Sequence, residues 1–166
     1  RRITFLSKED YLEQIQKKKD RQLSRVQTAY RQERAAFESV RSLDPDTGDY
    51  LQSCQVEAIR QELVRDQLKS IAQKMKGLLD DLAANSMSDA PQADSLEQVL
   101  SKLLEIADGQ LADAASRLRR QSGIAAGSTN ASPDPSFAAP AVNGAARELG
   151  RLVLLRSIAS AQAVYA

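Results

Sequence analysis

The chain has 166 residues, of which 42% are hydrophobic and only 4% are aromatic, with no tryptophan. This length suits a single domain or one extended helical unit, and a core built from Leu, Ile, Val and Ala is typical of helix packing rather than of a β-sandwich. The 23 basic and 22 acidic residues nearly cancel, which argues against a nucleic-acid binder driven by overall charge and against an acidic solvating tail. One cysteine and no histidine exclude an internal disulfide and a structural or histidine-based zinc site.

A first long helix is expected from about Ser7 to Ser42, because this stretch contains no Gly or Pro. Its start resembles a capping box, in which the Ser7 hydroxyl accepts a free backbone N–H and an acid lies three residues further on. From Leu23 the apolar positions recur at spacings of 3, 4, 7 and 3 residues, with Glu33 in the skipped position of this coiled-coil-like seam. The basic run at 17–19 interrupts the pattern, so these first turns are expected to be weakly held or to dock on another element.

Residues 43–49 form a compact break between helices. Pro45 ends the first helix, and Gly48 with the neighbouring aspartates favours a turn, after which Thr47 or Asp49 is expected to cap the next helix. Because the connection is short, this second helix, expected over 50–84, must return antiparallel to the first. Residues 1–84 are therefore predicted to form a long helical hairpin.

The apolar pattern of the second helix changes in its middle. Val56, Ile59 and Leu63 mark one face, and a second stripe runs from Val64 to Leu82 at alternating spacings of 4 and 3 residues. The offset between Leu63 and Val64 indicates a change of partner or a local skip in the repeat. In the antiparallel register the end of this stripe meets the basic run at 17–19, where we expect a third helix or a partner to cover it.

A polar linker is expected at 85–94, followed by a third helix over 95–121 that packs back on the hairpin. Asp94 with Glu97 resembles a capping box, and Gly123 is a plausible stop for this helix.

The remaining sequence divides into two segments. Residues 122–143 are rich in Ser, Gly, Ala, Asn and Pro and predict a flexible linker. Residues 144–166 predict a helix that is apolar nearly all round, which favours burial in its own bundle or in a partner. The sequence thus predicts an all-α fold: a long antiparallel, coiled-coil-like hairpin with a third helix and a tethered C-terminal helix.

The turn at Asp44–Asp49 resembles the start of a calcium loop and the Asp-x-Asp-x-Thr motif of phosphate-transferring hydrolases. The glycine comes one place early for a calcium loop, whose twelfth position is Gln55 rather than Glu. In the hydrolase motif the fifth residue is Gly48 rather than Thr, and no strand precedes it. We interpret the motif as a helix stop and cap, and Cys54 as a buried seam residue rather than a reactive thiol. No phosphate loop or Ser/His/Asp set is present, so neither an enzyme nor a cofactor is expected.

The expected function is that of a non-enzymatic structural or assembly subunit, which binds protein subunits of a larger assembly through its helix faces. The last segment supports this expectation, because its apolar perimeter exceeds what one neighbouring helix can cover. A homo-oligomeric coiled coil stays open, since the same heptads could pair between chains. The candidate partner-binding residues are the apolar positions of the last segment and the basic cluster of the first helix: Leu149, Leu152, Val153, Leu155, Ile158, Lys17, Lys18, Lys19 and Arg21.

The alternative is binding of nucleic acid or another anionic surface through residues 1–34. Residues 1–41 hold eleven basic against six acidic side chains, but the two kinds are interleaved and no aromatic platform accompanies them. Nucleic acid is therefore not the expected partner. No apolar run approaches the roughly 20 residues that span a bilayer. Because the chain begins with Arg1 rather than Met, we expect a processed form, located in the cell or an organelle after removal of a targeting peptide.

Overall fold

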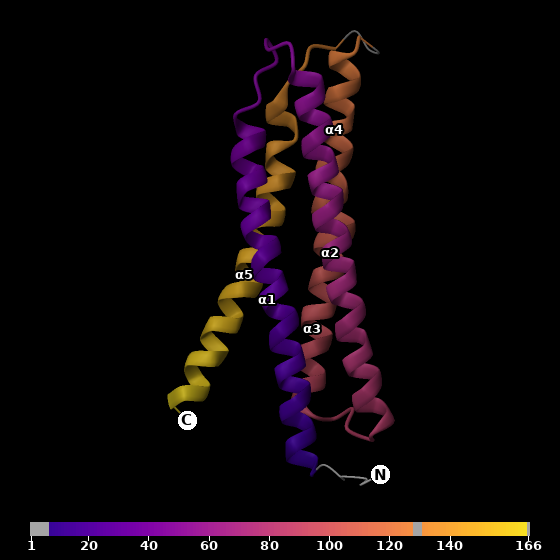
Figure 1. Ribbon diagram of the computed structural model, residues 1–166, viewed down its shortest axis with the longest axis vertical. Coiled ribbons are helices and arrows are strands. Elements are labelled where there is room, and N and C mark those ends of the chain that lie inside the picture. Colours follow the sequence, from indigo (N-terminus) through magenta and orange to yellow (C-terminus); the bar gives the residue numbers. More distant parts are fainter. Residues whose placement is uncertain (1–6, 128–130, 166) are drawn as a thin grey trace, which may run out of the picture.

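The structure, a computed structural model, describes residues 7–127 and 131–165, with the side chains of these ranges described up to residue 155 apart from Pro135. The predicted all-α class is confirmed for this part of the chain, which consists of helices and connecting turns (Figure 1). The elements in chain order are α1 (Lys8–Arg41), α2 (Tyr50–Ala84), α3 (Pro91–Ile106), the π-helical turn η1 (Ala107–Leu111), α4 (Ala112–Ala125), the 3-10 turn η2 (Pro135–Phe137) and α5 (Ala139–Tyr165).

Helices α3, η1 and α4 follow one another without a break and form one long rod. The chain therefore runs up along α1, down along α2, up through α3–α4 and down along α5 (Figure 1). Helix α1 packs against both α2 and α5, and α2 packs against α3 and α4. This arrangement is that of an up-down-up-down helical bundle.

The first two helices begin and end where the sequence predicts them. The backbone N–H of Asp10 donates to the Ser7 hydroxyl at 3.1 Å, which caps α1 as expected. In the turn, Asp44 Oδ1 accepts from the Asp46 backbone N–H at 2.9 Å, and the Thr47 hydroxyl donates to the Asp44 carbonyl at 2.8 Å. The predicted cap of α2 by Thr47 or Asp49 is wrong, because Asp49 stands at the cap position without a side-chain bond and the Thr47 hydroxyl is bonded to Asp44.

The third helix begins four residues earlier than predicted. Pro91 occupies its first turn, where a fixed φ suits the helix and the missing N–H would have no partner anyway. Ala90 stands at the cap position with extended backbone and no side-chain bond. Asp94 and Glu97 therefore lie inside the helix rather than at its start, and the predicted capping box is wrong.

The same rod also ends later than predicted. Helix α4 continues through Gly123 to Ala125, and Gly127 follows with a φ of +75° and donates its N–H to the Ile124 carbonyl at 2.9 Å. This left-handed conformation suits a glycine just after a helix end. The predicted linker over 122–143 is correspondingly too long, because α4 covers its start and α5 its end.

The wider turn η1 was not expected from the sequence. It lies in the middle of the rod and places Asp108 on the surface, between the buried Ala107 and Leu111. Asp108 accepts from Lys69 at 2.7 Å and from Arg65 at 3.2 Å, so the turn is joined to α2 by ion pairs.

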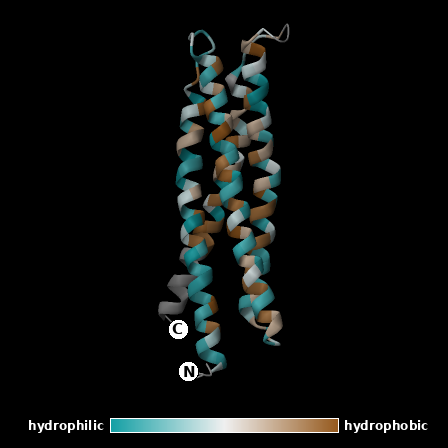
Figure 2. Cartoon of the chain, turned by 45° about the vertical axis from the view of Figure 1, so that its right-hand side comes forward, coloured by the Kyte–Doolittle hydropathy of each residue, from teal (hydrophilic) through white to brown (hydrophobic). Residues whose placement is uncertain are grey.

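The core is aliphatic and lies between the four rods (Figure 2). The predicted stripe of α2 from Val64 to Leu82 faces inward along its whole length. At the lower end the third helix covers this stripe, and Lys19 Nζ donates to Ser95 Oγ at 2.9 Å. The fully buried large side chains come from all four rods and include Ile15, Leu68, Ile71, Met75, Leu82, Leu96, Leu103, Leu118 and Leu149.

The part of helix α5 up to Val153 belongs to this bundle and is more than a tethered segment, while the C-terminal part diverges from α1 (Figure 1). A Cβ atom added at Gly150 would lie 3.1 Å from Tyr30 Cε2, so the glycine lets α5 come close to α1. Leu149 is fully buried beside it, and Lys102 joins α3 to Glu148 of α5 at 3.1 Å.

Neighbouring leucines of α3 test this assignment of the core. Leu103 is 0% exposed and Leu104 is 40% exposed. Leu103→Ala is expected to lower the free energy of unfolding by about 2–5 kcal/mol, because it leaves a cavity between packed helices. Leu104→Ala should cost less than about 1 kcal/mol. Urea denaturation followed by circular dichroism measures both, and equal losses would contradict the assignment.

Candidate functional site: the groove between α1 and α2

The apolar candidates from the last segment are largely used within the chain. Leu149 and Leu152 are buried against α1 and the third helix, and Val153 packs half-buried on the same core. These three side chains therefore do not offer a free surface to a partner, because α5 is a member of the bundle. Leu155 is 63% exposed, whereas the side chain of Ile158 lies outside the described residues.

The basic candidates of α1 divide in the same way. Lys17 pairs with Glu13 at 2.6 Å, and Lys19 donates to Ser95, where partial burial lowers the pKa of its ammonium group. Lys18 and Arg21 are exposed, and neither makes a hydrogen bond or ion pair within the described residues.

The structure leaves another apolar stripe in solvent, on the first half of α2. Val56 is 40%, Ile59 is 51% and Leu63 is 57% exposed. The sequence marked these residues as one face but gave no sign that the face is uncovered. From Val64 onward the stripe faces the core, so the offset at Leu63–Val64 is the point where the apolar face of α2 turns from solvent to the interior.

Two hollows lie between α1 and α2 beside this stripe. The first, of about 590 Å³, is next to the turn at 43–49, and the second, of about 350 Å³, lies further down the two helices. Arg60 lines both hollows, so they form one groove, which we call the α1/α2 groove. Val56 lines its upper part, and Ala35, Ala36, Leu63 and Val64 line its lower part.

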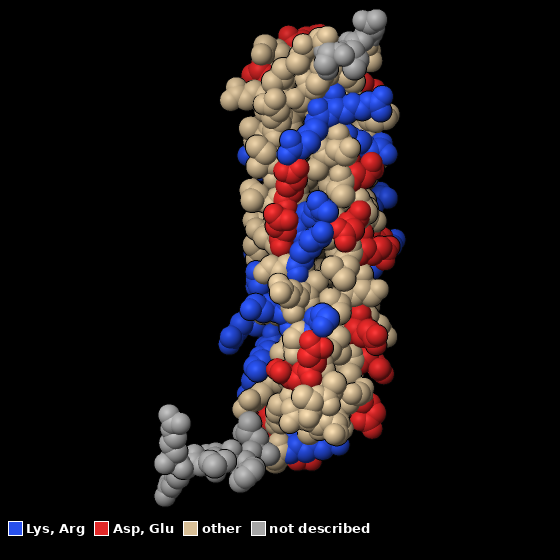
Figure 3. Space-filling model, turned by 90° about the vertical axis from the view of Figure 1, so that its right-hand side faces the viewer, with Lys and Arg blue, Asp and Glu red and all other residues tan. Residues whose placement is uncertain are grey.

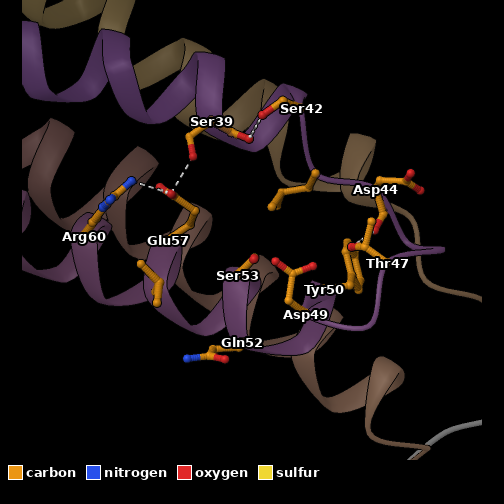
Figure 4. Close-up of a pocket in the computed structure, with 12 residues that line it drawn as sticks. Ser39, Ser42, Asp44, Thr47, Asp49, Tyr50, Gln52, Ser53, Glu57 and Arg60 are labelled. Atoms are coloured by element: carbon orange, nitrogen blue, oxygen red, sulfur yellow. Dashed lines mark hydrogen bonds and ion pairs between the residues drawn. The ribbon is translucent and has the colours of Figure 1, made fainter.

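Charged and hydroxyl side chains hold the upper part of the groove together (Figure 4). Glu57 Oε1 accepts from the Ser39 hydroxyl at 2.6 Å and from Arg60 Nη1 at 2.6 Å. The side chain of Glu57 is almost fully buried, while that of Arg60 is 56% exposed. This contact connects α1 to α2 near the turn and fixes Arg60 on the rim.

A second buried carboxyl group lies deeper in the seam. Gln61 Nε2 donates to Glu33 Oε2 at 3.2 Å, and both side chains are 0% exposed. Burial raises the pKa of Glu33 from 4.5 to about 8, an effect that the Gln61 hydrogen bond opposes and the nearby charge of Glu57 increases. Glu33 is therefore protonated at neutral pH, because a charged carboxylate would lack water and a cation here.

These polar residues make the seam weaker than an apolar one. One oxygen of each of Glu33, Glu57 and Gln61 is buried without a hydrogen-bond partner. An unsatisfied buried polar atom typically costs about 1–3 kcal/mol. The sequence placed Glu33 in the seam but missed Glu57 and Gln61, which would have been found by aligning the two helices about the turn.

Cys54, which follows the groove residue Ser53 on α2, is shielded from solvent. The Cys54 thiol is fully buried, and burial raises its pKa despite the opposing Tyr50 hydroxyl, so it stays protonated. Among the described residues no group of three or more His, Cys, Asp and Glu side chains could hold a metal ion. No described helix is long and apolar enough to cross a membrane.

Comparisons with family models, with curated proteins and with solved structures returned no match.

The raised pKa of Glu33 predicts a pH-dependent stability. Between about pH 4.5 and 8 an unfolded Glu33 releases its proton while the folded one keeps it. The free energy of unfolding should therefore fall as pH rises through this range and level off above it, by an amount on the order of a few kcal/mol. Glu33→Gln cannot ionise and should remove this fall, which makes the variant more stable than the parent at pH 8.

Thermal denaturation from pH 4 to 9 measures the difference between the two proteins. Glu38→Gln, at an exposed position of the same helix, is the matched control and should follow the parent protein. A Glu33→Gln profile parallel to that of the parent would show that Glu33 ionises normally.

Proposed function

We propose that this protein is a non-enzymatic subunit of a larger assembly, which binds a helix of a partner protein in the α1/α2 groove. The observation that carries the proposal is the exposed apolar stripe of α2, of which Val56 and Leu63 line a groove already hollowed between two helices. Apolar residues three and four apart on a helix form the kind of face that packs against another helix.

The energetic argument is based on water exposure. Fully burying one large aliphatic side chain contributes roughly 1.5–3 kcal/mol, and these three residues are about half exposed. A partner helix could thus gain a few kcal/mol from the stripe alone. The small Ala35 and Ala36 leave room for its side chains, in the manner of helix-in-groove recognition.

The opposite flank of α2, next to α4, also holds a hollow, of about 510 Å³ and lined by Ile59 and Arg119, but its charged side chains are already paired. There, ion pairs join α2 to the rod formed by α3, η1 and α4: Arg119 with Glu62 at 2.7 Å, and Asp108 with both Arg65 and Lys69. Figure 3 shows basic and acidic side chains interleaved along the face of α2 and α3–α4. Because these charges are already paired with each other, this face of the bundle is expected to stay in contact with solvent rather than to bind a partner.

Binding of nucleic acid through the first helix is the weaker proposal. Lys17 and Lys19 are engaged within the chain, which leaves fewer free cations than the sequence offered. A contact based on phosphates would also leave the exposed stripe of α2 without a role.

Affinity purification from the native source with crosslinking tests the proposal. Val56→Ser with Leu63→Ser should lose the partner that the parent chain retains, because the apolar contact is removed. Both positions are exposed, so stability should change by no more than about 1 kcal/mol per site. Leu104→Ser, at an exposed leucine of α3, is the control and should keep the partner. Equal recovery with all three proteins would contradict a role for the groove.

A further inference from the structure

We infer that the occupant of the α1/α2 groove is an acidic amphipathic helix of a partner protein; this inference rests on the proposed function and names the chemistry of the partner. It is argued from the cations that continue the line of the groove below its apolar part.

Helix geometry places these cations on the groove face. Eleven residues make about three turns of an α-helix and return to the same side. Arg21 lies eleven residues before Gln32, and Lys74 lies eleven residues after Leu63. Gln32 and Leu63 both line the lower hollow. Arg21 and Lys74 therefore lie on the same faces of α1 and α2, about three helical turns further from the connection at 43–49.

The contacts across the seam place these two cations at the same height. Glu33 of α1 is hydrogen-bonded to Gln61 of α2, so these two residues lie at the same level of the bundle. Arg21 lies twelve residues before Glu33, and Lys74 lies thirteen residues after Gln61, which are nearly equal lengths of antiparallel helix. Lys18 lies one turn below Arg21 on the same wall. The groove therefore changes from apolar at Val56 and Leu63 to basic at its lower end.

These cations have no carboxylate of their own. Lys18, Arg21 and Lys74 are exposed and make no hydrogen bond or ion pair within the described residues. Arg25, between them and the hollow, is bonded only to the amide of Gln22. Their state differs from that of Arg65, Lys69 and Arg119 on the other flank, which are all paired with acids.

A helix with an apolar face and acidic flanks complements this surface. Its apolar residues would cover Val56 and Leu63, and its carboxylates would meet Arg21 and Lys74. The distance from Val56 to Lys74 corresponds to about 27 Å of helix, which a partner helix of roughly 20 residues spans. Each exposed charge pair adds only about 0.2–1 kcal/mol, but like charges facing this surface would be repelled, so the cations select the partner.

Three labelled 21-residue helical peptides test the inference with the whole chain. They share one leucine face and differ in the residues that flank it, which are Glu, Gln or Lys. Fluorescence anisotropy should show the tightest binding for the Glu peptide, and its affinity should weaken as salt rises from 50 to 500 mM.

Charge reversal locates the contact. Arg21→Glu with Lys74→Glu should weaken binding of the Glu peptide about tenfold, because two attractions become repulsions. The control is Arg31→Glu with Arg120→Glu, which changes the net charge equally at exposed positions that line neither hollow, and it should bind as the parent does.

The outcomes separate the inference from the proposed function. Equal binding of the three peptides would overturn the acidic partner and leave the groove as a binding site. Failure of all three to bind would overturn both. If the chain sediments as a dimer and Leu63→Ser dissociates it, the groove binds a second copy of the chain. If only duplex DNA displaces the Glu peptide, the cations bind nucleic acid. Either result would overturn the inference.

Discussion

The packing of the bundle depends on one position in α2, between Leu63 and Val64, where the apolar face of the helix changes from exposed to buried. From Val64 onward α2 presents aliphatic side chains to α1, α3, η1 and α5, and this half forms the main core. Before Val64 the positions facing α1 are Glu57, Ala58 and Gln61, while Leu63 points away from the core. One offset of a single residue therefore produces both a firmly packed half and a half with an open groove.

The polar seam and the exposed stripe are two consequences of this offset. An apolar residue at the position of Glu57 or Gln61 would bury well and draw α1 and α2 together. Glu33, Glu57 and Gln61 instead bury polar atoms, some without partners, and such groups weaken a seam while fixing its register. The upper half of the bundle is held by the packing of α2 on α4 and of α1 on α5, where the second apolar cluster includes Leu118 and Val142.

The sequence predicted helix boundaries correctly where a single local signal marked them. Ser7 and the turn at 43–49 bounded the first two helices correctly, because neither helix contains a breaker. The third helix was misplaced because two signals competed: Pro91 started it before the apparent capping box, and Gly127 rather than Gly123 took the left-handed conformation that ends it. Burial of Leu149 and exposure of Leu63 depend on which rods become neighbours, which periodicity within one helix does not reveal.

The distribution of paired charges separates the faces of the bundle. Across the flank between α2 and the rod of α3, η1 and α4, the cations of α2 are matched by acids such as Asp108, which joins the two rods. Along the groove face, Arg21 and Lys74 lie about three helical turns beyond the open apolar surface and make no ion pair within the described residues. Unpaired like charges repel one another and lower the stability of the free chain slightly. An acidic, apolar partner helix would remove both this repulsion and the exposure of Val56 and Leu63 to water. The same features that lower the stability of the free chain therefore favour binding of such a partner.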